Sequence, residues 1–252
     1  MIGLLIDLTN PAQFFACCGL FELGHRLWPD TTGHFEGREF VLSRGDLPEL
    51  VERTARAPLI NLVPSDISAS PMELGAPFSL RLDWWKDRAG GGAGLKPWAG
   101  TMLASRIGQA MQSALTVALA SGRFLDEGFV VTGADRKKVE PYYFDARRGA
   151  SALPLDVGFS ADALQLETVA YPATEFLTLV GLQRFRPAIE SPRVFRYRAW
   201  TAPLPVTLAA LAACGALQSG GGTYQFENAF RTDQRKHKAF SPAVPVNGDR
   251  DE

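Results

Sequence analysis

The sequence is poor in cysteine and histidine, with three of each in 252 residues. The cysteines (Cys17, Cys18 and Cys214) are odd in number and two are adjacent, so they form neither a disulfide framework nor the paired spacing of a zinc site. No histidine lies at ligand spacing from a cysteine or a carboxylate. The sequence therefore predicts no bound metal, and nothing in it indicates a cofactor.

Long hydrophobic runs are also missing. No apolar run approaches the roughly 18 residues that a membrane-spanning helix needs. The start, MIGLLIDLTNP, has no basic residues ahead of its apolar stretch and reaches Asp7 almost at once, unlike a signal peptide. We therefore expect a first β-strand here, no membrane partner and a cytoplasmic location.

Recognisable catalytic motifs are scarce. The run GGGAGLKP lacks the Gly-Lys-Ser/Thr of a nucleotide-hydrolysing phosphate loop, and the carboxylates form no compact pair of the kind that nuclease metal sites use. Cys17 and Cys18 lie within an apolar helical stretch, where buried, inert thiols are common. These features favour a binding protein over an enzyme, although His25 or His237 could still serve as the general base of a ribonuclease.

The net charge of −1 hides an uneven distribution. Residues 81–148 contain 11 basic and 7 acidic side chains, and residues 184–238 contain 9 and 3. The remainder carries 6 basic and 17 acidic side chains, so two segments are basic in an otherwise acidic chain. Such segments can hold a polyanion on one face of the protein, or they can be ordinary solvated surface.

Strands and helices alternate along the chain, which predicts an α+β fold. Asn10 followed by Pro11 marks a helix start, and Asp46 marks another. We expect a ferredoxin-like or RNA-recognition-like sheet with helices, in one composite domain over residues 1–238 with halves of about 1–150 and 151–238. Residues 239–252 are predicted to be a disordered tail.

The second half repeats a pattern of the first. A strand, Pro11, Phe14 and Gly19-Leu20 are echoed by a strand, Pro172, Phe176 and Gly181-Leu182, with a spacing that differs by one residue. One interpretation is a duplicated β-α-β unit, and the other is two unrelated strand–helix junctions.

Candidate contacts come from the basic segments and the aromatic residues among them. Bases stack on aromatic faces, and phosphates bind to cations. In the expected strand FSLRLDWW, Trp84 and Trp85 point to opposite faces, so at most one of them can stack on a base. The predicted nucleic-acid-binding residues are Lys96, Trp98, Arg106, Arg147, Arg148, Arg184, Arg186, Arg231, Arg235, Lys236 and Lys238. Trp84, Trp85, Tyr142, Tyr143 and Phe185 are further candidates for stacking.

Several strings occur in a family-like order. They are LTNPAQFFACCGLFELGHRLWP, LRLDWWKDRAGGGAGLKPWAGTMLASRIGQAM, YPATEFLTLVGLQRFRP and YRAWTAPLPVTLAALAACG. Together they resemble the small CRISPR-associated proteins of type I-U systems, also called type I-G, over most of residues 4–240. That family is sometimes treated as a reduced large subunit of the Cascade effector complex.

The resemblance implies a non-catalytic subunit of an RNA-guided surveillance complex. Its partners would be CRISPR RNA, target DNA and the other Cascade subunits, and it could read the duplex flank of the target. Two alternatives stay open: a guide-processing ribonuclease of ferredoxin-like fold, and a scaffold that binds only protein.

Overall fold

The structure, a computed structural model, describes residues 1–64, 66–89, 91–149, 169–231 and 237–246. The helices are α1 (Pro11–Leu27), α2 (Leu47–Arg56), η1 (Trp84–Lys86, 3-10), α3 (Gly92–Leu95), α4 (Ala104–Ser113), α5 (Leu115–Ala120), α6 (Ala146–Gly149), α7 (Pro172–Gly181) and α8 (Val206–Ala213). The strands are β1 (Ile2–Leu5), β2 (Thr32–Glu36), β3 (Glu39–Leu42), β4 (Leu59–Asn61), β5 (Met72–Leu74), β6 (Leu80–Leu82), β7 (Ala188–Ser191), β8 (Val194–Arg198), β9 (Leu204–Pro205), β10 (Thr223–Phe230), β11 (Lys238–Phe240) and β12 (Val244–Val246). The predicted α+β class is confirmed.

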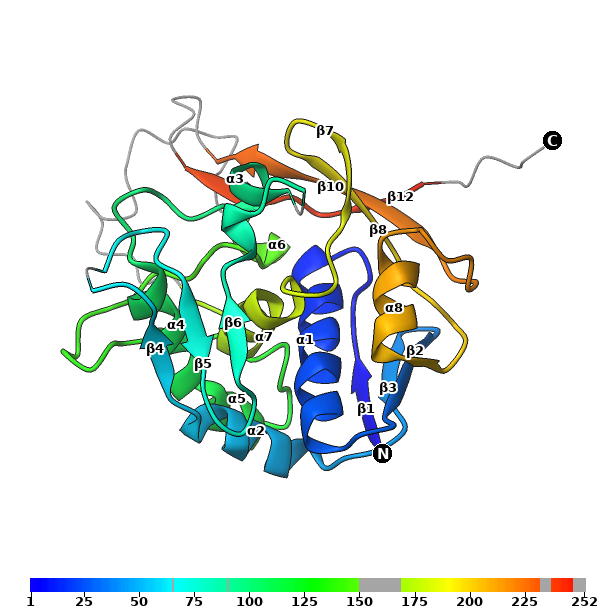
Figure 1. Cartoon of the computed structure of the whole chain (residues 1–252). Coiled ribbons are helices and arrows are strands. Elements are labelled where there is room, and N and C mark those ends of the chain that lie inside the picture. Colours follow the sequence, from blue (N-terminus) through cyan, green and yellow to red (C-terminus); the bar gives the residue numbers. More distant parts are fainter. Residues whose placement is uncertain (65, 90, 150–168, 232–236, 247–252) are drawn as a thin grey trace.

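Three antiparallel sheets surround a central helix pair. The N-terminal sheet has the order β1-β3-β2-β9, the C-terminal sheet has the order β11-β10-β8-β7 with β12 also on β10, and the small sheet has the order β4-β5-β6. In Figure 1, α1 and α7 lie in the middle, the N-terminal sheet on one side, the small sheet on the other and the C-terminal sheet across one end. Helix α1 is buried on every side from residue 11 to residue 24, which explains its nearly continuous apolar sequence.

Local sequence signals set both predicted helix starts. The side chain of Asn10 accepts a hydrogen bond from the backbone N–H of Ala12 at 3.2 Å, and Pro11 follows as the first residue of α1. The side chain of Asp46 accepts one from the N–H of Glu49 at 2.9 Å at the start of α2. Both predicted caps are confirmed.

The repeated Pro…Gly pattern brings α1 and α7 together. A Cβ atom added to Gly19 would lie 2.0 Å from the backbone oxygen of Leu177, and one added to Gly181 would lie 2.0 Å from that of Phe15. The backbones therefore cross in contact at two glycines that occupy equivalent places in the two segments. After each helix comes a hairpin and then a further helix: β2–β3 and α2 in the first half, β7–β8 and α8 in the second. The derivation of the halves from one duplicated unit stays a prediction.

A ferredoxin-like sheet is not confirmed. The order β1-β3-β2 matches three strands of that arrangement, in which a fourth strand lies beside β1. Here β4 pairs with β5 in the small sheet, and the fourth strand of the N-terminal sheet, β9, pairs instead with β2. The side of β1 away from β3 therefore has no strand beside it in the part of the chain that the structure describes.

The predicted tail is partly wrong. Phe240 ends β11, and Val244–Val246 forms β12, which pairs antiparallel with the start of β10. Apolar residues in the predicted tail, including Phe240 and Ala243, pack into the core. Pairing with β10 therefore orders a segment whose composition resembles a disordered end. Residues 247–252 lie outside the described residues.

Candidate nucleic-acid interface

The tryptophans that were candidates for stacking are core residues instead. Trp84, Trp85 and Trp98 are at most 3% exposed and pack edge-to-face on one another, with ring centres 5.3 to 6.3 Å apart. The chain turns into the 3-10 helix η1 at Trp84, which directs both neighbouring indoles inward. The Nε1 atom of Trp85 donates to the backbone oxygen of Ala69 at 3.1 Å, and that of Trp98 donates to the oxygen of Ser68. The predicted stacking role of Trp98 is therefore wrong.

The remaining stacking candidates are also buried. Tyr142 and Phe185 are 0% exposed and Tyr143 is 6% exposed. Phe185 stacks on Trp200, and Tyr142 packs against Trp98. The aromatic residues interleaved with cations in the sequence therefore form the inner layer of the protein, and the cations lie on its outside.

Three predicted phosphate contacts are neutralised by carboxylates of the protein itself. Arg106 Nη2 lies 2.9 Å from Asp135 Oδ2, Arg184 Nε lies 2.5 Å from Glu22 Oε2, and Arg186 pairs with Asp87. Burial by itself raises the pKa of Glu22, but hydrogen bonds and ion pairs with Arg184 and Arg26 bring its pKa below the ordinary value. These pairs do not exclude a ligand, but they reduce the charge that each arginine offers to one.

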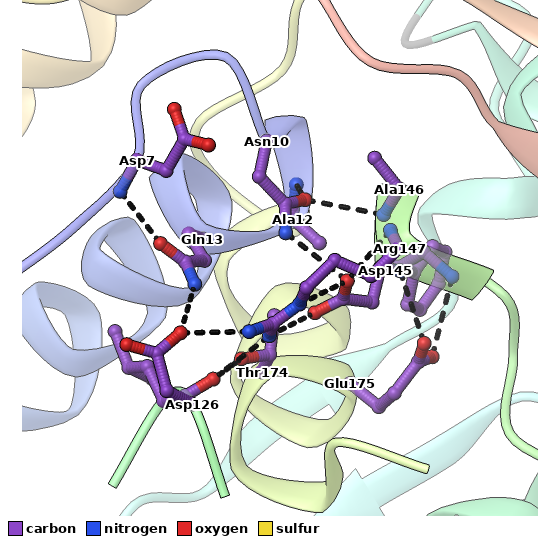
Figure 2. Close-up of polar contacts among 12 residues, drawn as sticks. Asp7, Asn10, Ala12, Gln13, Asp126, Asp145, Ala146, Arg147, Thr174 and Glu175 are labelled. Carbon is purple, nitrogen blue, oxygen red and sulfur yellow. Dashed lines mark hydrogen bonds and ion pairs between the residues drawn. The ribbon is translucent and has the colours of Figure 1, made fainter. Parts of the chain in front are cut away.

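Arg147 is held in a buried polar network (Figure 2). Its Nη2 lies 2.7 Å from Asp145 Oδ2, its Nη1 lies 2.7 Å from Asp126 Oδ1, and its guanidinium lies 3.5 Å from the centre of the Tyr171 ring. Asn10 donates to Asp145 at 3.1 Å, which joins this network to the start of α1. The charge of Arg147 is thereby used inside the protein.

Glu175 lies at the buried end of the same network. Burial raises the pKa of its carboxyl group to about 8, although the backbone N–H groups of Phe144 and Asp145 donate to it at 3.3 and 3.0 Å. The group is therefore mainly protonated at neutral pH. Glu175 and Asp145 are both fully buried, so their role is to join α7 to the segment before α6.

A different set of cations gathers without carboxylates. Lys96 follows α3, Lys238 begins β11, and Arg193 lies in the turn between β7 and β8. Burial lowers the pKa of Lys238, and the like charges of Lys96 and Arg193 lower it further. Its Nζ donates to the backbone oxygen of Ala93 in α3 at 3.3 Å, and neither lysine forms an ion pair with any residue that the structure describes. We call Lys96, Arg193 and Lys238 the basic patch.

A second group of cations lies next to the patch around Tyr143. Arg231, at the end of the β10–β11 hairpin, lies with its guanidinium 3.6 Å from the centre of this ring, and Arg148 lies 5.7 Å from it. The N–H of Phe240 donates to the backbone oxygen of Tyr143, which fixes the ring beside β11. Glu140 is shared, because Lys138 lies 2.7 Å and Arg148 3.9 Å from it. Cations therefore outnumber carboxylates along this end of the C-terminal sheet.

Arg193 is the member of the patch that was not predicted. Its φ is +69°, in a two-residue turn after Pro192, a position at which glycine is usual. The guanidinium lies 4.6 Å from the centre of the Phe230 ring and 3.3 Å from a carboxylate oxygen of Glu227. The signal in the sequence was the SPRV turn, with arginine where glycine would cost less strain.

The predicted residues thus separate into three groups. Lys96, Lys238, Arg231 and Arg148 come together around β11, whereas Arg106, Arg147, Arg184 and Arg186 are paired elsewhere and Trp98 is in the core. Arg235 and Lys236 lie outside the described residues. No helix in the described ranges is long and apolar enough to cross a membrane. No protein-family model, curated protein or solved structure matches the chain.

Proposed function

We propose that the protein is a non-catalytic nucleic-acid-binding subunit of a type I CRISPR RNA-guided surveillance complex. In this proposal the basic patch contacts the backbone of the guide RNA or of the target DNA. The observation that carries it is the cluster of Lys96, Lys238 and Arg193, where like charges lie close enough to lower a lysine pKa. Phosphates would supply the counter-charges that the described carboxylates largely do not. The resemblance noted in the sequence supplies the type of complex.

The patch is suited to phosphates and not to bases. The large aromatic side chains beneath it are buried, so no ring lies free for stacking among the described residues. Lysine Nζ atoms on flexible stems bind phosphate as point charges, without reading sequence. Binding through the patch is therefore expected to be insensitive to sequence and strongly sensitive to salt. Base pairing with the guide would supply specificity.

The experiment compares two doubly neutralised variants of the intact complex, purified with its guide RNA from cells that hold the whole operon. K96Q/K238Q removes two charges from the patch, and R53Q/R56Q removes two from the exposed face of α2. Affinity for nucleic acid is measured against salt concentration. If both lysines contact phosphates, K96Q/K238Q reduces the slope of log K against log salt by about 1.8 on duplex DNA, or by about 1.4 on a single strand.

The control R53Q/R56Q is expected to keep the slope of the unmodified complex. An unchanged slope and affinity for K96Q/K238Q would reject the patch as a phosphate contact. If K96Q/K238Q fails to assemble but its residual complexes bind normally, the patch binds protein, which is the scaffold alternative. Repeat RNA cleaved by the purified chain, and no longer cleaved after H25A/H237A, would establish the ribonuclease alternative instead.

A further inference from the structure

The edge of β1 that faces away from β3 is open. In the antiparallel pairing of these strands, Ile6 lies opposite Arg38 and its N–H donates to the Arg38 oxygen at 2.8 Å. Hydrogen-bonded and non-hydrogen-bonded positions alternate along an antiparallel ladder, so the N–H and C=O groups of Gly3 and Leu5 point away from β3. Within the described residues, neither N–H group donates a hydrogen bond across the open edge.

The side chains confirm this alternation. Ile2 and Ile6 are 3% exposed and face the core, whereas Leu5 is 75% exposed. A free strand edge with an exposed leucine is a template for pairing with another strand. The next outward N–H along the chain, that of Asp7, is taken by the side chain of Gln13 at 2.7 Å (Figure 2), so the open edge ends there.

A cleft of about 510 Å³ begins where this edge ends. Leu5 and Ile6 line one part of it, together with the exposed Arg38 and Arg123. Two carboxylates of the cleft are already used: Asp7 accepts from Thr9, and Asp126 accepts from Gln13 and Arg147. Arg38 and Arg123 form no ion pair with the rest of the described chain, so the cleft offers uncompensated positive charge.

We propose that the edge of β1 and this cleft bind an extended segment of a partner protein that carries acidic side chains. The segment adds a strand beside β1, with its backbone paired to Gly3 and Leu5. Its carboxylates lie near Arg38 and Arg123. Backbone groups that point outward favour a peptide over a nucleic acid, because nucleic acid has no complementary N–H and C=O ladder. The site is separate from the basic patch and does not depend on the function proposed for it.

The test uses synthetic pentapeptides and the full-length chain. The probes alternate valine with glutamate (VEVEV) or with lysine (VKVKV), and a third probe, VEPEV, has proline at its centre. We expect VEVEV to bind at least about tenfold more tightly than VKVKV, because two ion pairs change sign between them. VEPEV is expected to bind more weakly than VEVEV, since proline removes a backbone donor. Hydrogen exchange should show fast amides at Gly3 and Leu5 in the free chain and protection of Leu5 with VEVEV.

Two variants make the result specific. L5P removes an outward N–H and is expected to abolish binding, and R38E/R123E, at two exposed positions, is expected to reverse the preference to VKVKV. Equal binding of VEVEV and VKVKV, binding of VEVEV that survives R38E/R123E, or protected Gly3 and Leu5 amides in the free chain would each overturn the proposal. So would the absence of any peptide binding, or displacement of bound VEVEV by oligothymidylate, which would mark a nucleic-acid site instead.

Discussion

Replacement of Gly19 by alanine should be among the most destabilising single substitutions in this protein. The added methyl carbon would lie 2.0 Å from the backbone oxygen of Leu177, 2.9 Å from the Leu177 carbonyl carbon and 3.1 Å from the nitrogen of Gly181. All three are backbone atoms, so no side-chain rotation relieves the overlap. The two helices at the centre of the core would have to move apart by more than 1 Å, since real Cβ atoms essentially never come closer than 3.0 Å.

The expected cost is large and has a control in the same helix. Overpacking of a tight core typically costs about 1–3 kcal/mol and occasionally more. We expect G19A to lie at or above the upper end, about 3 kcal/mol, because the whole α1–α7 contact loosens. At Gly24 the nearest atom to an added Cβ is a side-chain methyl of Leu42 at 3.5 Å, an ordinary contact. G24A should therefore be neutral or stabilise by about 0.5–1 kcal/mol through helix propensity.

Urea unfolding followed by tryptophan fluorescence measures both changes. A third variant tests whether the two glycines share one crossing. Once α1 and α7 have separated, the methyl group of G181A fits at little further cost, so G19A/G181A should cost less than the sum of its single variants. If G19A is as stable as G24A, or if G19A and G181A are strictly additive, the close crossing of α1 and α7 is wrong.

The remaining predictions concern the polar network and the patch. The pKa of Glu175 is raised to about 8 in the folded state, so stability should fall as pH rises from about 4.5 to 8, by about 1.4 kcal/mol per unit; E175Q should flatten that slope in urea titrations. R193G should raise stability by about 1 kcal/mol, because glycine tolerates the positive φ, yet lower the salt slope of nucleic-acid binding by about one; an unchanged slope would remove Arg193 from the interface. N10A should cost about 2–3 kcal/mol in thermal unfolding, because it removes a cap and a donor to buried Asp145, whereas D46A, a cap on exposed α2, should cost about 1 kcal/mol; equal costs would contradict the network.

Features that depend on a few neighbouring residues were predictable. Asn10 with Pro11 and Asp46 each supply a capping oxygen where a helix begins, and both helices start there. The start of α4 was not predictable, since the apolar periodicity extends back to Trp98, whereas the helix begins at Ala104. Trp98 is instead held by its indole N–H on Ser68, a residue thirty positions away. Such long-range contacts leave no local signature in the chain.

By itself, the sequence determined the α+β class, the two helix caps, the paired glycines and the presence of two basic segments, because propensity, capping and charge are properties of local residues. Only the tertiary structure decided which cations are available. Burial of Glu22 and Asp145 assigns Arg184 and Arg147 to the protein itself. The β10–β11 hairpin brings Lys238 beside Lys96, 142 positions earlier in the chain, where each cation raises the cost of the other's charge. The distances between side chains, which set these energies, exist only after folding.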